Sequence, residues 1–324
     1  MIEVPPIGVL MMAYGSPDSL DQMEEYLLDI RGGRATPPSL VEEIKERYAR
    51  IGGRSPLLDL TLAQAFALDK ELNRRHNPTG MRFRVYVGMR HWAPRIEEAA
   101  AQIVADGIDR LVALVMAPHQ SRLSTGAYFR KLEEAIAELG MRPAIGRVES
   151  WHDHPDLIVA LAEKAASAIA RFVDGTPFVI FTAHSLPNRI LAEGDPYDRQ
   201  LRETAQLLAG RLSLAGGRWC FCYQSSGRSS EPWLGPQIEE TILDLIKDGE
   251  KELLVVPIGF VCDHVEVLYD IDIAARELAE AHGARLERSV SLNSSPALIS
   301  ALADLVYRAV PQPAGTPAAA QSFP

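Results

Sequence analysis

Short apolar runs alternate with longer amphipathic stretches along almost the whole chain. The apolar runs predict eight β-strands, at Ile7–Tyr14, Phe83–Met89, Leu111–Ala117, Ala144–Ser150, Phe178–Ala183, Trp219–Tyr223, Leu253–Val261 and Arg285–Val290. Between them, apolar positions recur with helical spacing and predict helices at Leu20–Ile30, Ser39–Ile51, Leu62–His76, Pro94–Asp106, Leu123–Leu139, Pro155–Phe172, Tyr197–Leu212, Pro236–Lys247, Val265–His282 and Pro296–Val310. Strands that alternate with helices indicate parallel sheets covered on both faces, so we expect an α/β protein.

The predicted strands fall into two sets of four. We therefore expect two similar Rossmann-like domains, each a parallel four-stranded sheet flanked by helices, at residues 1–150 and 151–310. The last helix is expected to pack back on the first domain. Residues 311–324, rich in Pro, Ala, Gly and Ser, predict a disordered tail.

The first strands of the two halves end in the same way. One runs into Ala13 and Tyr14, and the other into Ala183 and His184, each followed by a turn. Because open α/β sheets bind ligands beyond the carboxyl ends of their strands, these two side chains are expected to face a cleft between the domains.

Composition narrows the class of protein. The 33 basic and 43 acidic residues among 324 give a net charge of −10 without a basic run, which argues against nucleic acid or an anionic membrane as the main partner. No apolar stretch approaches the length of a membrane span. Three cysteines cannot form a disulfide framework, which favours a reducing compartment, and we expect a cytoplasmic protein without stable membrane insertion.

Two places carry candidate chemistry. His184, at the end of a strand, can exchange protons near neutral pH, although a structural histidine would fit there as well. After the strand ending near Cys262, Asp263 and Glu266 have the spacing of a helix capping box. Glu266 and Asp270 lie four residues apart on one predicted helix face, where carboxylates could bind a cation or pass protons, and His264 adds a further group.

Arginines gather between Arg31 and Arg54. Guanidinium forks suit carboxylate binding, but taken alone this cluster is better interpreted as a solvated surface. Cys220 and Cys222 are interpreted as small core residues and His119 as a structural histidine.

Five segments in order resemble the ferrochelatases: Ala13–Pro17, Ile51–Leu57, Ala183–Pro187, Glu231–Pro236 and Val261–Asp270. The resemblance runs from about residue 7 to about residue 308. It implies two Rossmann-like domains around a porphyrin cleft, and an enzyme that inserts Fe²⁺, its substrate, into a porphyrin with release of two protons. The resemblance also implies that His184 and Glu266 are the catalytic, metal-handling pair and that Asp270 continues a carboxylate path. Relatives often have an acid where this chain has Ala274, with Asp272 nearby.

In having a tyrosine at position 14, the chain resembles the subgroup of bacterial enzymes that metallate coproporphyrin III. This implies that Tyr14 faces the macrocycle opposite His184. The residues that match porphyrin and propionate contacts of the subgroup are Arg31, Arg47, Tyr48, Ser55 and Tyr128. The C-terminal segment contains no cysteine, so no iron–sulfur cluster is expected.

Several alternatives stay open. The chain could be a protoporphyrin IX ferrochelatase, a cobalt chelatase acting on an early tetrapyrrole, or a haem or porphyrin carrier without chemistry. A carrier would need Tyr14 and the arginines but not His184, Glu266 and Asp270 together. The resemblance favours a monomer that hands its product transiently to the next haem-pathway enzyme, without a nucleic-acid partner.

Overall fold

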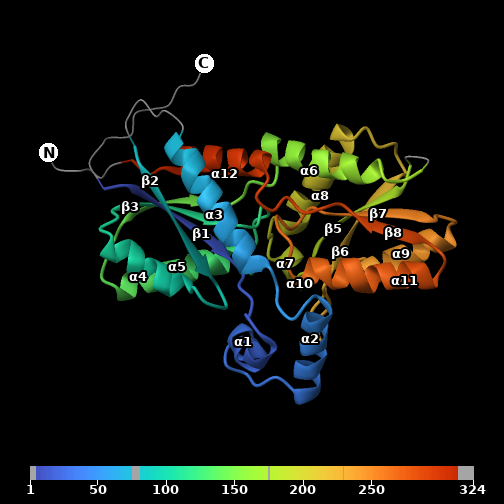
Figure 1. Cartoon of the computed structure of the whole chain (residues 1–324), viewed down its shortest axis with the longest axis horizontal. Coiled ribbons are helices and arrows are strands. Elements are labelled where there is room, and N and C mark those ends of the chain that lie inside the picture. The colour runs from blue at the N-terminus through green and yellow to red at the C-terminus, as the bar shows by residue number, and fades with distance from the viewer. Residues whose placement is uncertain (1–4, 75–80, 174–175, 229, 313–324) are drawn as a thin grey trace.

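The structure is a computed structural model that describes residues 5–74, 81–173, 176–228 and 230–312. It contains two four-stranded sheets, which Figure 1 shows side by side along the long axis of the molecule. The strands are β1 (Ile7–Ala13), β2 (Phe83–Met89), β3 (Arg110–Val115), β4 (Ala144–Val148), β5 (Phe178–His184), β6 (Trp219–Gln224), β7 (Glu252–Pro257) and β8 (Arg285–Arg288).

All strand pairs are parallel, and the two sheets have the same topology. The first sheet has the order β2-β1-β3-β4 and the second the order β6-β5-β7-β8. The predicted α/β class and the paired four-stranded sheets are therefore confirmed. Since β1 and β5 occupy equivalent places, the strand ends after Ala13 and at His184 correspond to each other, as their sequences indicated.

Helices cover both faces of each sheet (Figure 1). They are α1 (Met23–Ile30), α2 (Pro38–Arg50), α3 (Leu57–Arg74), α4 (Ile96–Ala105), α5 (Thr125–Glu138), α6 (Pro155–Ile169), α7 (Arg189–Ala192), α8 (Tyr197–Arg211), α9 (Ile238–Lys247), α10 (Val265–Leu268), α11 (Arg276–Ala281) and α12 (Pro296–Ala309). A 3₁₀ turn, η1 (Leu20–Gln22), precedes α1, and a π turn, η2 (Asp270–Ala275), lies between α10 and α11. Helices α1 and α2 project from the body of the molecule at the bottom of Figure 1, with α2 below α10.

The largest departure from the predicted elements lies at 265–282. One continuous helix was expected there, but the chain forms a single turn, α10, followed by the π turn η2 and then α11. Apolar periodicity marks the buried positions of this stretch, such as Val267 and Ile271, and does not register the extra residue that a π turn accommodates. The short helix α7 was not predicted, and His76 and residues 313–324 of the proposed tail lie outside the described residues.

One hydrophobic cluster runs through both halves of the molecule. It combines apolar side chains of β1, such as Met11, with those of β5, such as Phe181, and with Leu302 of α12. Trp151 is fully buried in it and donates its indole N–H to the carbonyl of Val115 at 3.3 Å. Helix α12 packs against both α3 and α6. This shared core fixes the two sheets relative to each other, and with them the strand ends that carry the site.

Candidate active site

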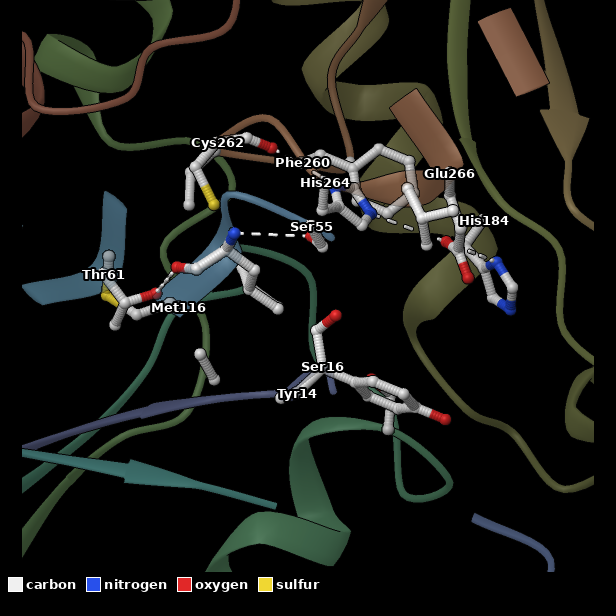
Figure 2. Close-up of a pocket in the computed structure, with 18 of the residues that line it drawn as sticks. Tyr14, Ser16, Ser55, Thr61, Met116, His184, Phe260, Cys262, His264 and Glu266 are labelled. Atoms are coloured by element: carbon white, nitrogen blue, oxygen red, sulfur yellow. Dashed lines mark hydrogen bonds and ion pairs between the residues drawn. The ribbon is translucent and has the colours of Figure 1, made fainter. Parts of the chain in front are cut away.

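A pocket of about 250 Å³ opens between the carboxyl ends of the two sheets. One wall comes from the end of β1 and includes Tyr14, and the other contains His184 and Glu266 (Figure 2). The lining is mainly apolar, with Met12, Met116 and others beside the polar groups. A concave, largely apolar site with a few polar groups is typical of a small-molecule site.

His184 and Glu266 form an ion pair on one wall. The Nδ1 atom of His184 lies 3.2 Å from an Oε atom of Glu266 (Figure 2). The geometry of this contact is that of an ion pair and not of a directed hydrogen bond. About one third of each side chain, 32% and 33%, is exposed, which lets both groups face the pocket.

The charges of this pair stabilise each other. Burial by itself would lower the pKa of His184, but the carboxylate of Glu266 and then Asp270 raise it above its usual value. Burial would likewise raise the pKa of Glu266, but the neighbouring His184 and His264 hold it well below its ordinary range. Each group of the pair therefore favours the charged form of the other.

His264 is a second imidazole near the same carboxylate. Its Nε2 lies 3.6 Å from Glu266, and its Nδ1 contacts the carbonyl of Cys262 at 3.2 Å. Its ring packs on Phe260 with centroids 4.5 Å apart. Two imidazoles thus contact one carboxylate on this wall, and all three are ligand types that divalent transition metals accept.

The facing wall carries no formal charge at Tyr14. Burial, and then the charge of Glu266, raise the pKa of the Tyr14 phenol to about 12, so it keeps its proton at neutral pH. Its ring packs against His91 with centroids 4.7 Å apart. Gly15, which follows it, adopts φ +97°, and its carbonyl accepts a hydrogen bond from the hydroxyl of Tyr26 at 3.0 Å. This hydrogen bond from Tyr26 therefore fixes the turn after β1 to helix α1.

Asp270 lies behind Glu266, outside the pocket lining. It accepts a hydrogen bond from the hydroxyl of Ser225 and lies 3.6 Å from the guanidinium of Arg47. Burial is the main reason that its pKa is raised to about 6, with a further contribution from Glu266. A carboxyl group with this pKa can gain and lose protons near neutral pH.

The predicted porphyrin contacts divide into two groups. Four of them line the pocket, namely Tyr14, Tyr48, Ser55 and Tyr128. Arg31 and Arg47 do not line it in the part of the chain that the structure describes. Instead, Arg47 pairs with Glu43 at 2.9 Å as well as with Asp270, and it stacks over the ring of Tyr269.

The predicted capping box at Asp263 and Glu266 is wrong. The helix begins after His264, and Glu266 turns into the pocket. The backbone N–H of Asp263 donates to the side chain of Asn293 at 3.0 Å, not to Glu266. Spacing alone could not distinguish a cap from a site because both need the same acids at a strand-to-helix turn.

Two tyrosines that position the site were missed in the sequence. Tyr26 holds the carbonyl of Gly15, as described above. The hydroxyl of Tyr197 donates to the carbonyl of His184 at 2.9 Å, and its ring lines the pocket. Tyr197 starts a helix after Pro196, which gives no sign of a contact with a strand end thirteen residues earlier. His119, interpreted as structural, is buried and contacts the hydroxyl of Thr204 at 2.9 Å.

The fold and site together define a chelatase-like α/β protein. Among solved structures, the chain resembles SirB from Bacillus subtilis with Fe³⁺, with a TM-score of 0.58 and 12% identity over 94% of this chain and 95% of that one. It also resembles CbiX, the terminal enzyme for biosynthesis of siroheme in denitrifying bacteria, with a TM-score of 0.53 and 14% identity over 93% and 99% of the two chains. At these identities the likeness concerns the fold.

The ferrochelatase family model matches residues 6–310, and the chain belongs to this family. It is 44% identical over 306 residues to the ferrochelatase of Deinococcus radiodurans, which covers 94% of this chain and 96% of the relative. It is 39% identical over 308 residues to the coproporphyrin III ferrochelatase of Geobacillus sp., covering 94% and 98%. The protein is thus an enzyme that inserts ferrous iron into a porphyrin.

Membrane insertion was not expected from the sequence. Within the described residues, none of the helices combines the length and the apolar character needed to cross a bilayer.

Proposed function

We propose that this enzyme inserts Fe²⁺ into coproporphyrin III to form iron coproporphyrin III. The proposal is supported by relatives named coproporphyrin III ferrochelatase at 38–39% identity over 93–94% of the chain. The observation that carries the chemistry is the 3.2 Å pair of His184 and Glu266 across the pocket from Tyr14. One Fe²⁺ enters the macrocycle and two pyrrole protons leave it, so the site must handle both a cation and protons.

In this proposal His184 and Glu266 are the catalytic residues and the ligands that present iron. A nitrogen and a carboxylate hold Fe²⁺ weakly enough to release it to four pyrrole nitrogens. The approaching dication displaces any proton on the His184 imidazole, which leaves through the neighbouring carboxylates of Glu266 and Asp270. When iron passes to the pyrrole nitrogens, the freed imidazole accepts one pyrrole proton and the freed carboxylate of Glu266 accepts the other. Asp270, with its pKa of about 6, is the next group to receive these protons after Glu266 on their way to solvent.

Tyr14 and the surrounding side chains are proposed to bind the macrocycle. The phenol of Tyr14 faces the metal position from the side opposite His184. Tyr48, Ser55 and Tyr128 contact the porphyrin from the pocket lining, while Arg31 and Arg47 bind propionates at its edge. Because Arg47 already pairs with Glu43 and Asp270, a substrate propionate would replace protein carboxylates as its partner.

The substrate is tested by anaerobic insertion of Fe²⁺ into coproporphyrin III and protoporphyrin IX, followed by absorption. We expect kcat/KM to favour coproporphyrin III by about tenfold or more, since two additional carboxylates reach the arginines. Preference for protoporphyrin IX would overturn the proposed substrate and leave the catalytic pair standing.

The catalytic roles are tested separately with His184→Ala and Glu266→Gln. Both variants should lose iron insertion while still quenching tryptophan fluorescence on porphyrin binding. A porphyrin carrier would instead show binding without insertion in the unaltered protein. Full insertion activity in both variants would refute the proposed roles.

A further inference from the structure

One buried guanidinium contacts the chain on both sides of Glu266. Arg288 ends β8, and its side chain is only 10% exposed. Its Nε and Nη2 donate to the two carboxylate oxygens of Asp272, each at 2.8 Å. Its Nη1 lies 3.2 Å from Asp263. Asp263 precedes the segment with Glu266, and Asp272 follows it, so one side chain holds both ends.

Asp263 has further hydrogen-bond partners besides Arg288. Its two carboxylate oxygens accept hydrogen bonds from the hydroxyl of Ser291 at 2.7 Å and from the amide of Asn293 at 3.0 Å. The carbonyl of Asn293 accepts a hydrogen bond from Gln64 of α3 at 2.9 Å. The loop after β8 thus connects Asp263 to the first half of the molecule.

The segment between the two aspartates has little rigidity of its own. Between the two aspartates the chain forms only the single helical turn α10 and, after Tyr269, the first residues of the π turn η2. A single turn is marginal in isolation, because its few hydrogen bonds do not offset the ordering of the backbone. The position of the carboxylate of Glu266 therefore depends on anchors outside the segment.

We propose that Arg288 is a positioning residue that holds Glu266 at the pocket by bridging Asp263 and Asp272. The inference rests on the proposed role of Glu266 in handling iron and protons. It also gives Asp272 a function: this carboxylate is occupied by Arg288 and is not part of the path from Glu266 through Asp270. Lysine cannot replace the bridge, because an ammonium group lacks the planar fork that binds one carboxylate with two N–H groups and reaches a second.

The test compares Arg288→Lys with the matched control Arg285→Lys on the same strand. Arg285 is 41% exposed and pairs with Glu287 and Glu252, away from the segment that holds Glu266. The measurements are kcat/KM for Fe²⁺ at saturating porphyrin, the porphyrin Kd from fluorescence quenching, and thermal unfolding. We expect Arg288→Lys to lower kcat/KM for Fe²⁺ by about tenfold, the lower end of the loss seen when a group that orients a metal ligand is removed, because Arg288 acts on Glu266 through the two ends of its segment.

The porphyrin Kd of Arg288→Lys should stay within about twofold of wild type, as should all values of Arg285→Lys. A merely structural role would lower both iron insertion and porphyrin binding in proportion to the folded fraction. That proportional loss, or unchanged iron kinetics in folded Arg288→Lys, would overturn the inference. If Arg288→Lys does not fold, Asp272→Asn, which weakens one end of the bridge, decides by the same measurements.

Glu266→Gln is measured in the same series to separate the two proposals. Loss of insertion in Glu266→Gln with unchanged kinetics in the folded Arg288 variant refutes the positioning role alone. Normal insertion in Glu266→Gln refutes the proposed role of Glu266, and the positioning inference fails with it.

Discussion

His119 joins the two halves of the molecule through a bond that acid should break. It lies between β3 and α5, is 2% exposed, and contacts the hydroxyl of Thr204 in α8 at 2.9 Å. Burial, and then the nearby His152, lower the pKa of His119 from 6.5 to about 3. A depressed folded-state pKa means that the unfolded chain binds this proton more readily. The stabilisation is therefore complete above the unfolded pKa and is lost as the pH falls from 6.5 toward 3.

The size of the effect follows from the two pKa values. Between about pH 7.5 and about pH 5, one group titrating in this way removes about 2 kcal/mol from the free energy of unfolding. The variant His119→Gln keeps a donor near the position of Nε2 but cannot take up a proton. We expect wild type to lose about 2 kcal/mol more than this variant over that interval.

The assay is urea unfolding at both pH values, followed by far-UV circular dichroism. His282→Gln, at the exposed position that follows α11, is the control and should behave like wild type. Equal pH dependence in wild type and His119→Gln would refute the reasoning. It would mean that the buried ring reaches water, or that protonation is compensated by a partner absent from this structure.

Two further predictions concern the strand ends that form the site. Gly15→Ala should lower the free energy of unfolding by about 2 kcal/mol or more, because a Cβ at φ +97° would lie 2.8 Å from the backbone nitrogen of Trp92. Gly32→Ala, with φ +61° and open space around it, is the control, and equal losses in urea unfolding would contradict the steric argument. Tyr197→Phe removes the bond to the carbonyl of His184 and should lower kcat by about fivefold, corresponding to about 1 kcal/mol. An unchanged kcat would show that the strand end is held without this hydroxyl.

The two sheets and the pairing of strand ends could be predicted because they follow from local patterns. Buried parallel strands are continuous apolar runs, as in Ile7–Ala13, where every residue is buried. The similar strand ends at Tyr14 and His184 then indicated that these residues occupy equivalent positions in the two halves. The identical strand order of the two sheets confirms the repeat. What the pattern could not supply was the shared core around Trp151, which depends on contacts between distant elements.

The sequence predicted which acidic residues and histidines belong to the site, but not which residues they contact. Asp263 had the spacing of a helix cap, and only the packing of β8 against the π turn reveals that Arg288 and Asn293 occupy its carboxylate. Likewise, nothing local to Arg47 indicates its contact with Asp270, more than two hundred residues away. Long-range ion pairs have no sequence period, so they appear only when the chain is folded.

The equivalent strand ends carry opposite electrostatic character, and this asymmetry favours one direction of metal delivery. The second half places the ion pair of His184 and Glu266 at the pocket, whereas the first half places there the phenol of Tyr14, whose raised pKa leaves it neutral at neutral pH. A divalent cation is attracted to the carboxylate of Glu266, whereas the described residues that line the opposite wall include no carboxylate. Iron in our proposal therefore approaches the macrocycle from the side of His184, where the groups that accept the displaced protons also lie. The duplicated fold supplies two equivalent positions, and the chemistry depends on their having diverged.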